Sequence, residues 1–156
     1  MRNRIFVLYK YPIFYICLIV KNIYKMKNYR YELEFKVRDY ECDLQGIVNN
    51  SVYQNYLEHT RHEFLLSEGV SFSDLFDRGI VAVVARVDIQ YKNPLKSGDK
   101  FISKLNVEKQ GIKYVFYQDI YRLPDNKLCI KAQITTVTLI DGKLAHSSEL
   151  DNLTNN

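Results

Sequence analysis

The octapeptide Asp43-Leu44-Gln45-Gly46-Ile47-Val48-Asn49-Asn50 decides the fold predicted for this 156-residue chain. It places a carboxylate in a glycine turn immediately before a segment with helical periodicity, so Asp43 would face the start of a helix. Free N–H groups and the positive end of the helix dipole gather at such a start. A carbonyl held between the two would meet an oxygen attacker on one side and an oxyanion stabiliser on the other, which is the arrangement that acyl transfer requires.

The residues after the octapeptide have the spacing of an amphipathic helix. Asn49 or Asn50 is the predicted N-cap, and the helix is expected to end near Gly69. Core positions recur at intervals of three and four residues. They are Tyr53, Tyr56, Leu57, Thr60, Phe64 and Leu65. Glu58 and Arg61 occupy other positions, where we expect a surface pair or an interface contact.

Strand patterns surround this helix. Residues 29–37 alternate between apolar and charged side chains, which predicts a half-buried antiparallel strand. A short helix from Ser71 to Asp77 is followed only by strand-like segments. The expected strands are 85–92, 100–109, 113–122, 127–140 and a last short strand that includes 144–147. The pattern predicts an α+β domain, an antiparallel β-sheet wrapped around one long central helix. Because one helix covers little of so large a sheet, we expect a homodimer or homotetramer.

The chain is expected to hold a single domain at 26–150, an N-terminal extension at 1–25 outside it, and a C-terminal tail at 151–156. The formal net charge is +4, but five of the 22 Lys and Arg residues lie in the extension, which contains no Asp or Glu. The other 17 basic residues face 18 acidic ones, a net of −1. The domain itself is therefore not basic, and a nucleic-acid partner is not expected.

The extension has two interpretations. Its apolar run from Tyr11 to Val20 lacks a small-residue cleavage site and is shorter than the roughly 20 apolar residues that span a bilayer. We expect translation to begin at Met26, so that residues 1–25 are an artefact of start-site choice and membrane contact is not expected. The alternative is a membrane-surface anchor that uses Phe6, Tyr9, Phe14 and the flanking lysines.

Cysteine and histidine usage favours neither a disulfide framework nor a metal site. The three cysteines are odd in number, and no C-x-x-C or H-E-x-x-H pattern occurs. We therefore expect a cytoplasmic protein without metal or redox cofactor. His59 and His62 lie three residues apart on the long helix and are expected to be solvated.

Three segments in a fixed order resemble one family. They are the D-x-x-G-I-V turn at Asp43, the helix text Y-x-x-Y-L-E-x-x-R from Tyr53 to Arg61, and Y-K-N-P-L-K-S-G-D from Tyr91 to Asp99. Over about residues 29–150 the chain resembles the hotdog-fold acyl-CoA thioesterases of the 4-hydroxybenzoyl-CoA thioesterase type. The V-N-N sequence ending at Asn50 is also similar to the long-chain acyl-CoA and acyl-ACP thioesterase branch.

The resemblance implies a reaction and a site. The family's catalytic Asp falls on Asp43, which would act as a nucleophile or as a general base toward water. The backbone amide that polarises the thioester falls on Asn50. Supporting or substrate-positioning residues would be Gln45, Gly46, Val48, Asn49 and Tyr53. The implied substrate is a fatty or aromatic acyl-CoA, or an acyl carrier protein thioester, hydrolysed to free acid and thiol.

Two departures keep a second hypothesis open. Many bacterial relatives carry a His where this chain has Asn50, and the acyl-ACP branch carries one where this chain has Ile47, so base chemistry falls on Asp43. A non-catalytic acyl-thioester or lipid-binding module is the alternative, and Asp43 with Gly46 is also an ordinary turn signature. Cations available for coenzyme A phosphates, none of them singled out, are Arg86, Lys92, Lys96, Lys109 and Lys113.

Overall fold

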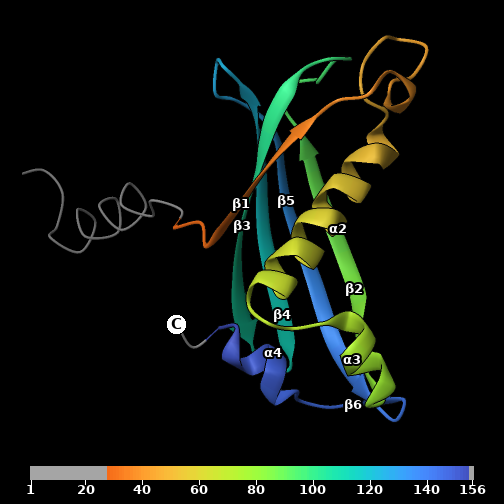
Figure 1. The fold of residues 1–156 in the computed structure, drawn as a ribbon, viewed down its shortest axis with the longest axis vertical. Coiled ribbons are helices and arrows are strands. Elements are labelled where there is room, and N and C mark those ends of the chain that lie inside the picture. Colours follow the sequence, from red (N-terminus) through yellow and green to blue (C-terminus); the bar gives the residue numbers. More distant parts are fainter. Residues whose placement is uncertain (1–27, 155–156) are drawn as a thin grey trace, which may run out of the picture.

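The computed structural model describes residues 28–154 (Figure 1). Its elements, in chain order, are β1 (Tyr31–Lys36), the 3-10 helix η1 (Asp39–Glu41), α2 (Asn50–Ser67), α3 (Phe72–Asp77), β2 (Ile80–Tyr91), β3 (Lys100–Gln110), β4 (Lys113–Leu123), β5 (Lys127–Ile140), β6 (Lys143–Leu144) and α4 (Ser148–Asn152). The expected extension at 1–25 lies outside the described residues. Within residues 28–154 no helix combines the length and the apolar character needed to cross a membrane.

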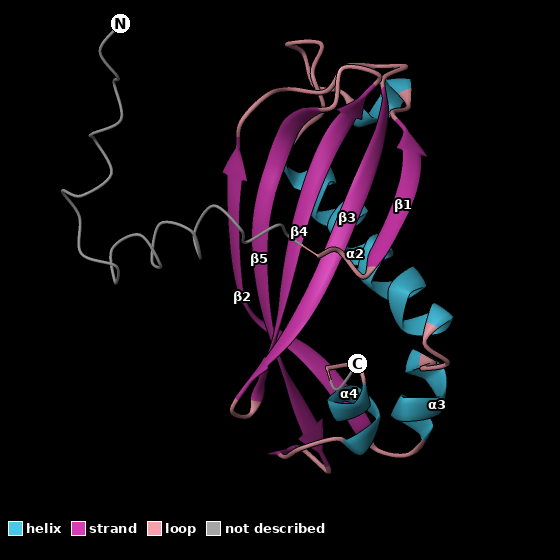
Figure 2. Cartoon of the chain, turned by 90° about the vertical axis from the view of Figure 1, so that its left-hand side faces the viewer, coloured by secondary structure: helices cyan, strands magenta, loops and turns pink. Residues whose placement is uncertain are grey.

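The strands form one antiparallel sheet in the order β1-β3-β4-β5-β2, with β6 paired to β5. The sheet curls around α2 (Figure 2), so the predicted α+β hotdog fold is confirmed. Helix α2 packs on β3 and β1, and the short α3 packs on β2. The outer side of β2 is an open edge of the sheet.

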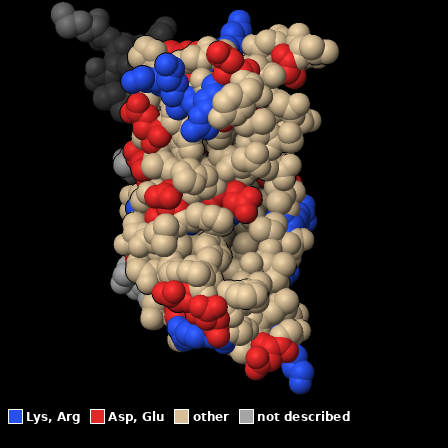
Figure 3. Space-filling model, turned by 45° about the vertical axis from the view of Figure 1, so that its right-hand side comes forward, with Lys and Arg blue, Asp and Glu red and all other residues tan. Residues whose placement is uncertain are grey.

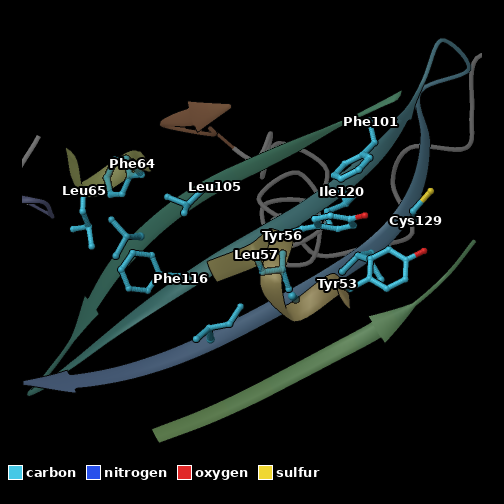
Figure 4. Packing of buried hydrophobic residues seen from close by; sticks show 14 of the residues in the cluster. Tyr53, Tyr56, Leu57, Phe64, Leu65, Phe101, Leu105, Phe116, Ile120 and Cys129 are labelled. Carbon is cyan, nitrogen blue, oxygen red and sulfur yellow. The ribbon is translucent and has the colours of Figure 1, made fainter. Parts of the chain in front are cut away.

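The core lies between α2 and the concave face of the sheet (Figure 4). All six helix positions predicted to face the core are buried. Phe64 from α2, Leu105 from β3 and Ile120 from β4 have no exposed surface. Burial of such side chains contributes about 1.5–3 kcal/mol each, which explains why the helical periodicity of this segment determines its orientation.

Two strand predictions need correction. Strand β2 begins at Ile80, five residues before the expected start, because its pairing with β5 shifts register between Val84 and Arg86. A bulge of this kind breaks the alternation by which a strand is recognised. The expected last strand is limited to Lys143–Leu144 and does not include 145–147.

A helix that the sequence analysis did not predict follows β6. Helix α4 spans Ser148–Asn152, with Ser147 at its N-cap position. Leu150 and Leu153 are buried and belong to the hydrophobic core. Residues 151–154, expected in a tail, therefore pack against the domain.

Candidate active site

The loop that carries Asp43 is closed by its own backbone. The Asp43 N–H donates to the Ile47 carbonyl oxygen at 2.9 Å, and the Gly46 N–H donates to the Asp43 carbonyl oxygen at 3.0 Å. Gly46 has a φ of +73°, a conformation that other residues adopt at a cost. An antiparallel bridge between Cys42 and Val48 holds the two ends of the loop together.

The Asp43 carboxylate has one fixed oxygen and one available oxygen. Oδ1 accepts the Gln45 N–H at 2.8 Å, which sets the side-chain rotamer. Oδ2 accepts no hydrogen bond from residues 28–154, and the residue is half-buried. The loop therefore presents a carboxylate oxygen that is available to a water molecule or a substrate carbonyl.

The first turn of α2 is capped in a way that leaves one amide unused. The Asn49 side-chain oxygen accepts the Ser51 N–H at 3.0 Å, and the Asn49 carbonyl accepts the Val52 N–H at 3.0 Å. The predicted capping role of Asn49 is confirmed. The Asn50 N–H has no acceptor among the described residues, so it is free to bind an oxyanion at the positive end of the helix.

One cavity of about 510 Å³ brings the predicted residues together. Its lining residues are Asp43, Gln45, Ile47, Val48, Asn49, Asn50, Tyr53, Tyr91, Lys92, Asn93 and Pro94. Gly46 shapes the loop without lining the cavity. The segment from Tyr91 to Pro94 was recognised as part of a motif but was not assigned to the site, because sequence alone does not place the end of β2 beside the start of α2.

Tyr53 helps to hold the two sides of the cavity together, the Asp43 loop with the start of α2 on one side and the segment after β2 on the other. Its hydroxyl oxygen accepts the Leu95 N–H at 3.0 Å, and the Val48 N–H donates to the Leu95 carbonyl at 2.9 Å. Burial raises the pKa of Tyr53 to about 12, so the phenol is neutral near pH 7. Tyr53 and Val48 thus hold the segment after β2 against the Asp43 loop.

The residues at the end of β2 complete the cavity. The Tyr91 hydroxyl donates to the Asn50 carbonyl oxygen at 3.1 Å, and its ring meets the Tyr53 ring edge-on at 5.7 Å. Asn93 donates its side-chain amide to the Leu128 carbonyl at 2.7 Å. Lys92 is exposed, and no carboxylate of residues 28–154 pairs with it. Of the five candidate cations, Lys92 is the one that lines this cavity.

Glu41 is a supporting residue that the sequence analysis missed. Its buried carboxylate accepts the Tyr56 hydroxyl and the Arg38 N–H, each at 2.6 Å. Its carbonyl oxygen accepts the Asn49 N–H at 3.0 Å. Burial and the bond to Glu41 raise the pKa of Tyr56. Glu41 therefore ties η1 to both α2 and its N-cap, and its acidic side chain three residues after Arg38 was only a weak capping signal.

The helix surface differs from expectation at one position. Glu58 and Arg61 do not form the surface pair that was one of two expectations: Arg61 donates to the side-chain oxygen of Gln118 at 3.0 Å, and Glu58 lies 3.8 Å from His62. The other expectation, an interface contact, stays a prediction. His59 and His62 are exposed, as predicted. Among residues 28–154 no cluster of three or more His, Cys, Asp or Glu side chains could hold a metal ion.

Comparison with known proteins supports the fold. The chain is 36% identical over 110 residues to the chloroplastic acyl-acyl carrier protein thioesterase ATL3 of Arabidopsis thaliana. The aligned stretch covers 70% of this chain and 58% of the relative's length. A hypothetical protein of Aquifex aeolicus, 29% identical, superposes with a TM-score of 0.75 over 80% of this chain and 99% of its own. Slr0204, a 1,4-dihydroxy-2-naphthoyl-CoA thioesterase from Synechocystis, has the same fold at 17% identity, with a TM-score of 0.74 over 79% of this chain and 93% of its own.

The family model of the Thioesterase-like superfamily matches residues 37–150, which include the Asp43 loop, α2 and all the strands after it. The match begins where β1 ends and finishes inside α4, so it covers most of the domain. This chain belongs to the Thioesterase-like superfamily.

Proposed function

We propose that this protein hydrolyses acyl thioesters to a free acid and a thiol, with Asp43 and the Asn50 N–H as the reacting and polarising groups. The observation that carries the proposal is that both line one cavity, the carboxylate with an unused oxygen and the amide without an acceptor among the described residues. The proposed reaction uses water and needs neither a metal nor a redox cofactor.

The proposed chemistry follows from the two groups. The Asn50 N–H polarises the thioester carbonyl and stabilises the tetrahedral oxyanion, an effect worth roughly a hundredfold or more in rate. Asp43 either attacks the carbonyl carbon, to form an anhydride that water cleaves, or removes a proton from an attacking water. In both routes the C–S bond breaks and the thiolate takes up a proton.

The carrier of the acyl group is proposed to be a phosphopantetheine thiol, either in coenzyme A or on an acyl carrier protein. The similarity to ATL3 supports the acyl carrier protein, whereas the exposed and unpaired Lys92 at the cavity suits a phosphate of either carrier. Fatty and aromatic acyl groups both fall within the proposed class.

We also propose that the working form is a homo-oligomer. Strand β2 is a 12-residue strand at the edge of the sheet, and Val83, Val84 and Val87 on it are exposed. Natural proteins rarely leave a long apolar edge uncovered, and a second copy of β2 is the simplest cover.

The test is a panel of acyl-CoA and acyl carrier protein thioesters with detection of free thiol. Asp43→Asn keeps the side-chain oxygen that accepts the Gln45 N–H, so folding is expected to persist while kcat/KM falls roughly a hundredfold or more. Asp77→Asn, on the exposed end of α3, is the matched control and is expected to keep full activity. Equal rates for wild type and Asp43→Asn would exclude the proposal. Substrate binding without any thiol release by the wild type would favour the non-catalytic binding module.

A further inference from the structure

A groove runs between α2 and β2, away from the Asp43 cavity. Two cavities of about 170 and 80 Å³ lie along it and share Glu58, Arg61 and Val84. The first begins at Gln54, one helical turn after Asn50, and faces Val87, which lies four residues before Tyr91 on β2. These two cavities are called the α2–β2 groove. Its position makes it the natural continuation of the site for the acyl part of a substrate.

The walls of the α2–β2 groove are mostly apolar. Leu57, Val84, Val87 and Ile134 line the nearer cavity, and Phe116 lines the farther one. Val84 and Val87 are 45% and 43% exposed, and the more extensive contacts of α2 with the sheet are those with β3 and β1. Figure 3 shows Lys, Arg, Asp and Glu as separate patches on a face made mostly of other residues. An alkyl chain in this groove would bury apolar surface along both walls.

Arg61 interrupts this apolar lining with a cation. Its Nη1 donates to the Gln118 side-chain oxygen at 3.0 Å, and Gln118, which has no exposed surface, donates its amide to the Leu57 carbonyl at 2.9 Å. The Arg61 guanidinium is therefore positioned by Gln118, and Gln118 is in turn fixed by its hydrogen bond to the Leu57 carbonyl. Burial lowers the pKa of Arg61, against the opposing effect of Glu58.

The guanidinium has more donors than this contact uses. Arg carries five N–H groups, and no carboxylate of residues 28–154 lies within ion-pair distance of Arg61. The charged or titratable neighbours that line the groove with it are Glu58, His62 and Tyr114. Glu58 and His62 lie 3.8 Å from each other at the solvent side, and the Tyr114 hydroxyl donates to Asp151. A desolvated cation with spare donors gains from an added acceptor oxygen and loses from a purely alkyl neighbour.

We propose that Arg61 is a specificity-determining residue that binds an oxygen atom of the acyl group, remote from the thioester. The proposal rests on the proposed function, since it takes the Asp43 cavity as the place of the thioester. Arg61 is 11 residues beyond Asn50, about 16 Å along the helix axis, and side chains of a helix lean back toward its N-terminus. The preferred substrate is thus a medium-length chain with a keto, hydroxyl or carboxylate oxygen toward its far end.

The test compares matched chains with and without that oxygen. The probes are dodecanoyl-CoA, its ω-hydroxy derivative and its ω-carboxy derivative, with decanoyl and tetradecanoyl sets to locate the best length. Wild type is expected to prefer the oxygenated chains in kcat/KM, and Arg61→Leu is expected to reduce that preference roughly tenfold or more. Arg61→Lys should restore part of the preference. Gln118→Glu, which sets a carboxylate against Arg61, should weaken the ω-carboxy preference more than the ω-hydroxy preference.

Control and binding measurements separate this proposal from the proposed function. Arg86→Leu makes the same substitution on a 74% exposed side chain of β2 and should leave the preference unchanged. Calorimetric binding of free dodecanoic and dodecanedioic acids reports on Arg61 without any turnover. If no thioester is cleaved but the diacid still binds better to wild type than to Arg61→Leu, the proposed function fails and the Arg61 proposal stands. An unchanged preference in Arg61→Leu overturns it, and a change in oligomer size alone would instead assign Arg61 to an interface.

Discussion

The Tyr91 hydroxyl at the end of β2 donates a hydrogen bond to the carbonyl oxygen of Asn50 at the start of α2, across 3.1 Å. The two residues are 41 positions apart in sequence. The bond joins the last residue of an edge strand to the helix turn that supplies the proposed oxyanion amide. Any movement of the end of β2 would therefore be transmitted to the site.

Removal of this hydroxyl should slow the reaction without unfolding the protein. In Tyr91→Phe the helix turn loses one hydrogen bond of about 1 kcal/mol, so kcat/KM is expected to fall about fivefold while the melting temperature hardly changes. The measurement is steady-state thiol release. The matched control is Tyr117→Phe on β4, which removes the hydroxyl that accepts a hydrogen bond from the Gln110 side chain on β3. This variant should keep the wild-type rate. A Tyr91→Phe rate equal to that of the control would show that the bond has no role in positioning.

The core beneath α2 should be sensitive to the loss of volume. Leu105 on β3 has no exposed surface, and Leu105→Ala is expected to lower the free energy of unfolding by about 2–5 kcal/mol because a cavity remains. Urea denaturation monitored by circular dichroism gives the value. Leu144→Ala, on the 59% exposed β6 side chain, should change it by no more than about 0.5 kcal/mol. Similar values for the two variants would contradict the core assignment.

The attachment of α4 should weaken in acid. Bonds from its own backbone N–H, from Ser147 and from Arg78 lower the pKa of Glu149 from 4.5 to about 2. Because the folded pKa lies below the unfolded one, this stabilisation is complete above about pH 4.5 and is lost as the pH falls toward 2. Glu149→Gln should therefore melt below wild type at pH 7, and the gap should close as the pH falls through that window.

A surface variant, Glu34→Gln, shows how much the melting temperature changes when an exposed carboxylate is removed. Glu34→Gln removes an exposed carboxylate whose partner, Lys100, lies 3.6 Å away on the neighbouring strand. Exposed pairs contribute little, so its melting temperature should stay close to that of the wild type at every pH. A Glu149→Gln gap that stays constant down to pH 2 would show that the carboxylate does not carry the pH dependence.

The open edge of β2 should carry the proposed self-association. Sedimentation of the wild type is expected to give a multiple of the 18.5 kDa chain mass. The double variant Val81→Lys, Val83→Lys places two cations on this edge, outside the lining of the α2–β2 groove, and should shift the protein toward the monomer. Tyr40→Lys changes a more exposed hydrophobic residue, on η1, and should leave the mass unchanged. A monomeric wild type at micromolar concentration would refute the homo-oligomer.

Patterns of local origin could be predicted from the sequence. The spacing of Tyr53, Tyr56 and Leu57 predicted the buried face of α2 because helical periodicity and burial are linked along one element. The bounds of β3, β4 and β5 agree with expectation within one residue, since glycine and Asp-Asn turns separate regular alternations. β2 and α4 were misjudged where a bulge broke the alternation and where a short helix followed a turn.

The sequence by itself determined the Asp43 turn, the capped helix start and their order along the chain, because these depend on neighbouring residues. Only the tertiary structure decided that Tyr91 and Lys92 join that site, that Glu41 anchors it to Tyr56, and that Arg61 binds Gln118 instead of Glu58. Each of these contacts joins residues from different elements. Curling of the sheet around α2 brings them together, and a one-dimensional pattern holds no information on that curvature.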